Sequence, residues 1–138
     1  MRRQLQGVVL SIAGLGLMGS AVLQGFVNVP HLRQDLLEIA VRPTLVAAVM
    51  LVLSFSVLAM FAFGAHVLSG AIRSFRGVHP QPAALWIVAA TYVVFGLTGF
   101  FVVIRSPHML GYTGMGLLVA VGTAMGQSRP GRRVQGAA

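Results

Sequence analysis

Residues 45–72 read LVAAVMLVLSFSVLAMFAFGAHVLSGAI, an apolar run with one ionisable side chain, His66. A helix needs about 20 consecutive apolar residues to cross the hydrocarbon core of a bilayer. This run is longer, so it predicts a membrane-spanning helix that tilts or extends beyond the lipid. Three further apolar runs also qualify, and the four predicted spans are residues 7–29, 45–72, 83–104 and 109–126.

The composition supports the same fold class. Of the 138 residues, 57% are hydrophobic and 9% are charged, whereas a soluble domain carries about 25% charged residues. Within lipid, every backbone polar group has to be bonded internally, and the spans lack the alternating pattern of barrel strands. We therefore expect an all-α integral membrane protein with four transmembrane helices in two sequential hairpins. It forms a single domain over residues 1–138 that ends in a flexible basic tail, residues 127–138.

The positive charges predict the orientation in the membrane. All ten basic residues are arginines. The side that holds both termini receives Arg2, Arg3, Arg73, Arg76, Arg129, Arg132 and Arg133, and the other side receives Arg33, Arg42 and Arg105. Because arginine-rich ends stay inside, both termini are expected in the cytoplasm. The use of Arg in place of Lys is typical of GC-rich genomes and favours a bacterial inner membrane.

The segment between the first two spans is the most structured polar stretch. Residues 30–43 begin and end with proline and contain Asp35 and Glu38, the only acidic residues of the chain. Its polar and apolar residues recur at helical spacing, and Glu38 is spaced for an ion pair with Arg42. The pattern predicts a short amphipathic helix at the outer interface. This helix is either a connector or, through Asp35 and Glu38, a docking surface for a partner.

Small residues form a face for close helix packing on the first span and another on the fourth span. Gly16 with Ser20, and Gly122 with Gly126, are each four residues apart, so each pair forms a smooth helical face. Such a face admits a helix of the same chain, of a second copy or of another membrane protein. The string GLGLMG over residues 14–19 matches a dinucleotide-binding fingerprint, but no strand precedes it, so that interpretation is rejected.

Histidines are the candidate cofactor ligands. His66 lies within the second span, where an ionisable side chain indicates either a functional role or a hydrogen bond to a neighbouring helix. His31 and His108 each follow a proline after the first and third spans, a faint sign of an internal repeat. Haem needs two histidines at one depth, which His31 and His108 could supply at the membrane edge and His66 only in a dimer. We expect no metal site, and no cofactor unless haem occupies one of these positions.

The residue content argues against several classes of function. The chain has no Cys and no Lys, and both acidic residues lie outside the spans, so covalent and acid–base catalysis lack their usual groups. The arginines are dispersed at span ends, which favours lipid headgroups over nucleic acid as their contacts. We expect a non-enzymatic accessory, assembly or interaction subunit of a larger membrane complex, with the bilayer, other subunits or copies of itself as partners. The alternatives are a homo-oligomeric carrier or channel for a small solute, and a haem- or quinone-binding subunit in electron transfer.

Overall fold

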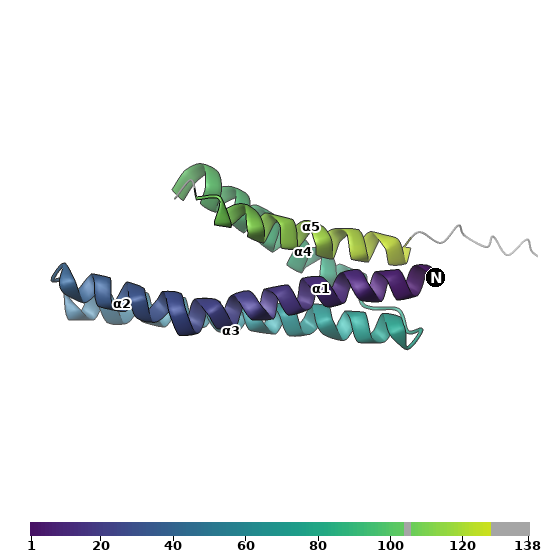
Figure 1. Ribbon diagram of the computed structural model, residues 1–138, viewed down its shortest axis with the longest axis horizontal. Helices are drawn as coiled ribbons and strands as arrows, with labels where there is room; N and C mark the ends of the chain where they lie inside the picture. The colour runs from purple at the N-terminus through teal and green to yellow at the C-terminus, as the bar shows by residue number, and fades with distance from the viewer. Residues whose placement is uncertain (104–105, 128–138) are drawn as a thin grey trace, which may run out of the picture.

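The computed structural model describes residues 1–103 and 106–127 of the chain. Almost all of these residues are helical, and no β-strand occurs among them. Four helices have the length and apolar composition needed to cross a membrane, which confirms the predicted all-helical class (Figure 1). They are Arg2–Glu38, Pro43–Phe75, Pro82–Val102 and His108–Gln127. The predicted tail lies outside the described residues beyond Gln127.

The first helix continues where the sequence predicts that the span ends. Three pieces follow one another without a loop: α1 (Arg2–Leu23), the π-helical turn η1 (Gln24–Asn28) and α2 (Val29–Glu38). Pro30 has no backbone N–H, and its ring crowds the preceding turn of a regular helix. The wider turn accommodates this proline, since the N–H of Val29 bonds to the carbonyl of Gln24, five residues back. The expected amphipathic segment is thus helical, but it prolongs the first span directly.

A tight turn after α2 reverses the chain. Ala40 has a left-handed φ of 55°, and the N–H of Val41 bonds to the carbonyl of Leu36, as in a helix-ending Schellman motif. The next helix, α3 (Pro43–Phe75), begins at a proline, which needs no hydrogen-bond acceptor there. Arg42 lies in the turn beyond the end of α2, and the structure contains no ion pair between it and Glu38.

Glycines bring α1 and α3 into close contact to form the first hairpin. A Cβ atom added to Gly14 would lie 2.9 Å from the backbone nitrogen of Leu68. One added to Gly64 would lie 2.9 Å from the backbone nitrogen of Met18. The two backbones therefore approach at a point where only glycine fits.

The second hairpin is built in the same way. Its elements are α4 (Pro82–Thr98), the π-helical turn η2 (Gly99–Val103) and α5 (His108–Gln127). A Cβ atom on Gly116 would lie 2.8 Å from the carbonyl oxygen of Ala89, and one on Gly96 would lie 2.6 Å from the backbone nitrogen of Thr113. Both close approaches hold α4 and α5 together.

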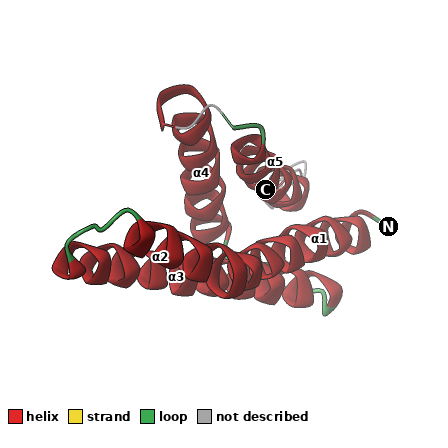
Figure 2. Cartoon of the chain, turned by 60° about the vertical axis from the view of Figure 1, so that its left-hand side comes forward, coloured by secondary structure: helices red, strands yellow, loops and turns green. Residues whose placement is uncertain are grey.

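The two hairpins are joined at one end of the molecule, which we call the N-terminal end. Here α1 packs against α5, and the core of buried side chains includes Leu10, Leu17, Val67, Leu85 and Val119. Towards the opposite end, which we call the α2 end, α4 and α5 diverge from α1 and α3 (Figures 1 and 2). The consecutive helices α3 and α4 are consequently in little contact.

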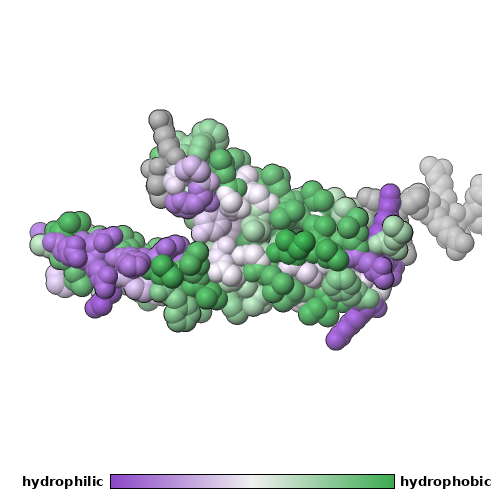
Figure 3. All heavy atoms as spheres, in the orientation of Figure 1, coloured by the Kyte–Doolittle hydropathy of each residue, from purple (hydrophilic) through white to green (hydrophobic). Residues whose placement is uncertain are grey.

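The surface carries a broad apolar band. Figure 3 shows hydrophobic side chains over the middle of the molecule, with hydrophilic ones at the N-terminal end and along α2. The helix Arg2–Glu38 has 37 residues and α3 has 33, about 55 and 50 Å at 1.5 Å per residue. The hydrocarbon core of a bilayer is about 30 Å thick. With the apolar band in lipid, α2 and the start of α3 extend beyond it as a helical stalk.

Candidate functional site

The divergence of the hairpins opens a cavity of about 590 Å³, which we call the interhairpin cleft. All four long helices contribute to it, and most of its walls are apolar or aromatic. Its lining residues are Gln24, Asn28, Leu53, Phe55, Ser56, Ala59, Met60, Phe63, Thr91, Tyr92, Phe95, His108, Met109 and Tyr112. The cleft lies on the α2 side of the buried core and opens to the outside of the molecule.

One buried polar group beside the cleft has no hydrogen-bond partner. The side chain of Tyr92 is only 3% exposed, yet its hydroxyl makes no hydrogen bond. Two other hydroxyls in the cleft are bonded within their own helices, Ser56 to the carbonyl of Val52 and Thr91 to that of Ile87. A buried hydroxyl without a partner destabilises the fold by about 1–3 kcal/mol, and any hydrogen-bond acceptor brought to it would offset that cost.

Aromatic rings fix the position of Tyr92. Its ring packs edge-on against Phe63, with centroids 6.3 Å apart, and stacks at 6.3 Å with Tyr112. Tyr112 in turn packs edge-on against Phe95 at 5.4 Å. Aromatic pairs of this geometry stabilise the position of each ring. The hydroxyl is therefore held in place, and the rings around it provide flat apolar surfaces.

The rim of the cleft is polar. The amide of Asn28 donates a hydrogen bond to the side-chain oxygen of Gln24 over 2.7 Å. Both residues belong to the π-helical turn η1, whose wider spacing alters the direction of these side chains relative to a regular helix. A neighbouring cavity of about 410 Å³ shares them and also contacts Ser20 and His108. Uncharged hydrogen-bonding groups thus surround the apolar interior of the cleft.

The three candidate histidines lie in different places. His108 begins α5, lines the cleft and lies 2.6 Å from the Ser106 hydroxyl through its Nδ1 atom. His31 is exposed on α2 and lines neither cavity, whereas His66 borders a separate cavity at the N-terminal end. Residues 1–103 and 106–127 contain no group of three metal-ligating side chains. His31 and His108, the candidate haem pair, therefore do not line the same one of these cavities.

The predicted partner-binding glycines take part in packing within the chain. Gly16 faces the side chain of Met115, and Gly122 faces Leu10, so both lie where α1 meets α5. Gly126 is next to the side chain of Gln6 in the same contact. Ser20, from the same predicted face, lines the neighbouring cavity. This contact within the chain accounts for Gly16, Gly122 and Gly126.

The acidic pair lies away from the cleft. Asp35 and Glu38 are exposed on α2, in the stalk. Neither is among the cavity-lining residues described above. Their use by a partner therefore remains a prediction, independent of the cleft.

Sequence reasoning missed the residue at the centre of the cleft. Tyr92 lies in the middle of an apolar span, and nothing in the spacing indicates that its hydroxyl is unpaired. The available signal was the pair Gln24 and Asn28, two amides four residues apart near the end of a long apolar run. Comparisons with protein-family models, with curated proteins and with solved structures found no match to this chain.

Proposed function

We propose that this chain is a non-enzymatic binding subunit of a larger membrane complex. Its interhairpin cleft holds an uncharged, lipid-soluble molecule that carries hydrogen-bond-accepting oxygens, as a quinone does. The observation that carries the proposal is the buried, unpartnered hydroxyl of Tyr92, a residue that lines this mostly apolar and aromatic cavity. A phenol hydroxyl can donate one hydrogen bond, and a quinone carbonyl accepts one.

The size and lining of the cleft support a small molecule as the occupant. Binding sites for small molecules usually measure about 300–1,000 Å³ and combine apolar walls with a few placed polar groups. The cleft has about 590 Å³ and that composition. Phe55 and Phe95 line the cleft and are also exposed on the apolar surface, so a molecule dissolved in lipid can enter beside them.

The alternatives fit the arrangement less well. Haem ligation requires two histidines at one site, and the cleft has only His108 among its lining residues. A carrier or channel requires a route to both sides, whereas the buried core closes the N-terminal end of the cleft. Binding without passage is the activity that this geometry favours.

The assignment as a subunit rests on the residues of the chain. It has no Cys, and its two carboxylates lie on the stalk, so proton and electron transfer to a bound quinone would be performed by another protein. The exposed stalk, with both acidic residues, offers a contact for such a partner outside the lipid.

Tyr92→Phe tests the cleft directly. We expect the purified chain to bind a short-tailed benzoquinone in detergent, and Tyr92→Phe to weaken that binding about fivefold, because a neutral hydrogen bond contributes about 1 kcal/mol. Equilibrium dialysis gives both affinities. The matched control is Thr91→Val, which removes a hydroxyl from the same cleft that is already bonded to Ile87.

Two results would contradict the proposal. Equal affinities of the wild type and Tyr92→Phe would show that the Tyr92 hydroxyl does not bind the ligand. Absence of any binding would show that quinone-like molecules are not the ligand. Native mass spectrometry after gentle extraction tests the subunit assignment separately, since a chain found only alone or as copies of itself is not an accessory subunit.

A further inference from the structure

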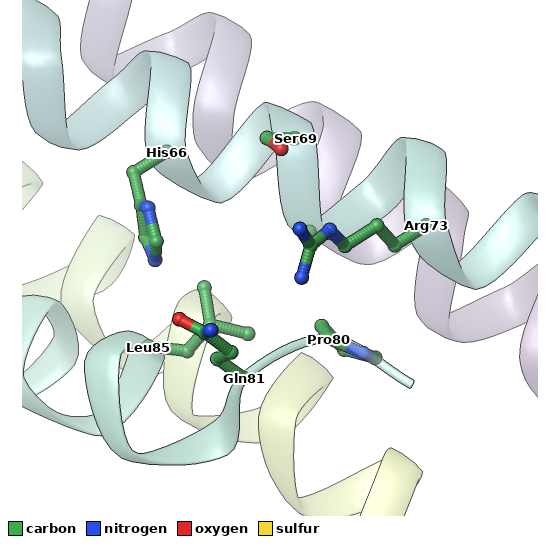
Figure 4. A pocket seen from close by; sticks show the side chains of 7 residues that line it. His66, Ser69, Arg73, Pro80, Gln81 and Leu85 are labelled. Atoms are coloured by element: carbon green, nitrogen blue, oxygen red, sulfur yellow. The ribbon is translucent and has the colours of Figure 1, made fainter. Parts of the chain in front are cut away.

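A second cavity lies at the N-terminal end, where α3 faces the start of α4. It has a volume of about 110 Å³, and its polar lining consists of Arg73, His66, Ser69 and Gln81 (Figure 4). We infer that this cavity is a binding site for a phosphate group, supplied either by the headgroup of an anionic lipid or by soluble phosphate.

The polar side chains converge from two helices. His66, Ser69 and Arg73 lie on one face of α3, spaced three and four residues apart. In Figure 4 the ring of His66 and the guanidinium of Arg73 point into the same space, and the amide of Gln81 lies across from them. A guanidinium, an imidazole, a hydroxyl and an amide all have N–H or O–H groups to donate. The cavity is therefore surrounded by donors, as an oxyanion requires.

The charge of Arg73 is not balanced by any of the described residues. Among the described residues its guanidinium has no hydrogen-bond or ion-pair partner, and the only two carboxylate side chains of the sequence are on α2, at the opposite end of the molecule. Arg73 is therefore available for an anion from outside the described part of the chain. Arginine suits phosphate because its planar fork of N–H groups matches two phosphate oxygens.

The start of α4 adds to the positive potential. Gln81 is the N-cap residue of this 17-residue helix, and its side chain makes no capping hydrogen bond. The first N–H groups of α4 thus lack a side-chain acceptor, and the helix dipole favours an anion at this end. The dipole of α4 therefore adds to the positive potential that the side-chain donors create at the cavity.

The location of the cavity favours a lipid phosphate. It lies at the end of the apolar band, and Trp86, one turn into α4, is 40% exposed, as is typical of aromatic residues at headgroup depth. Basic pockets between transmembrane helices at such a boundary bind anionic headgroups. A volume of about 110 Å³ accommodates one phosphate group, with the rest of the lipid outside.

Native mass spectrometry of the full chain in detergent tests the site with phosphatidylglycerol as the probe. We expect the wild type to retain phosphatidylglycerol in preference to phosphatidylcholine, whose positive choline finds no carboxylate here. Arg73→Gln should weaken retention about tenfold, because hydrogen bonds to charged groups are roughly twice as strong as neutral ones. The matched control is Arg76→Gln, which removes a nearby arginine that does not line the cavity.

Inorganic phosphate separates the two sources. If it binds the wild type but not Arg73→Gln, and phosphatidylglycerol shows no preference for the site, soluble phosphate is the ligand and the site is supported. Equal losses for Arg73→Gln and Arg76→Gln, or no loss for either, would overturn the inference. Arg73→Lys guards against misfolding: it keeps the charge, loses the fork and should retain an intermediate share of the lipid. Quinone binding in the cleft should be unchanged by all three variants.

Discussion

At the scale of single residues, the close crossing of α1 and α3 depends on Gly14. A Cβ atom at this position meets backbone atoms of α3, which cannot rotate away as a side chain can. We predict that Gly14→Ala lowers the free energy of unfolding by about 1–3 kcal/mol, the usual cost of overpacking. Titration of the detergent-solubilised protein with SDS, followed by circular dichroism, measures this change.

Gly19 provides the control for that experiment. It lies on the same helix, and a Cβ atom there would meet nothing within 4 Å. Gly19→Ala should leave stability unchanged or raise it by up to about 1 kcal/mol through helix propensity. If the two variants behave alike, the contact at Gly14 does not hold the hairpin together.

At the scale of helices, we predict that the middle of α3 lies in lipid and that the stalk lies outside it. Leu58 lies at the middle of α3 and is 68% exposed, whereas Leu37 lies on the stalk and is 49% exposed. We expect Leu58→Arg to impair membrane insertion, because arginine at the centre of a span costs about 2.5–3.5 kcal/mol. Leu37→Arg should insert normally. Resistance to carbonate extraction compares them, and similar losses for both would place the stalk in lipid.

The helices themselves follow from the sequence, but the course of the first one does not. Long apolar runs without charges specify helices in lipid, so the predicted spans agree with the described helices to within a few residues at most ends. Pro30 predicts a break in the helix, because proline has no backbone N–H to donate. The helix passes it because η1 inserts a wider turn before it, and no residue pattern in Gln24–Asn28 announces that turn.

The cleft could not be predicted for a related reason. Its width depends on how far α4 and α5 diverge from α1 and α3, which is set by contacts between helices distant in sequence. The small residues at Gly16 and Gly122 were identified, but their use within the chain, between α1 and α5, is a property of the assembled fold. Tyr92 becomes notable only when its surroundings are known.

At the scale of the whole molecule, the distribution of arginines predicts one orientation. The chain has no Cys, so single cysteines can be introduced without background labelling. We expect Gln34→Cys, on the stalk, to react with a membrane-impermeant maleimide added outside intact cells, and Val78→Cys, in the opposite loop, to react only after the membrane is opened. The reverse pattern would invert the predicted topology.

The divergence of the two hairpins also gives the molecule unequal cross-sections at its two ends. At the N-terminal end the four helices are gathered around a common core, whereas towards the α2 end they occupy a wider area. With the apolar band in lipid, a molecule of this shape acts as a wedge in the bilayer. Lipids beside the broad end have to spread around the protein, and those beside the narrow end do not. The elastic energy of the membrane around the protein is therefore lowest where the membrane bends towards the narrow end. An occupant that drew the hairpins together would reduce the taper, which couples filling of the cleft to the curvature of the surrounding membrane.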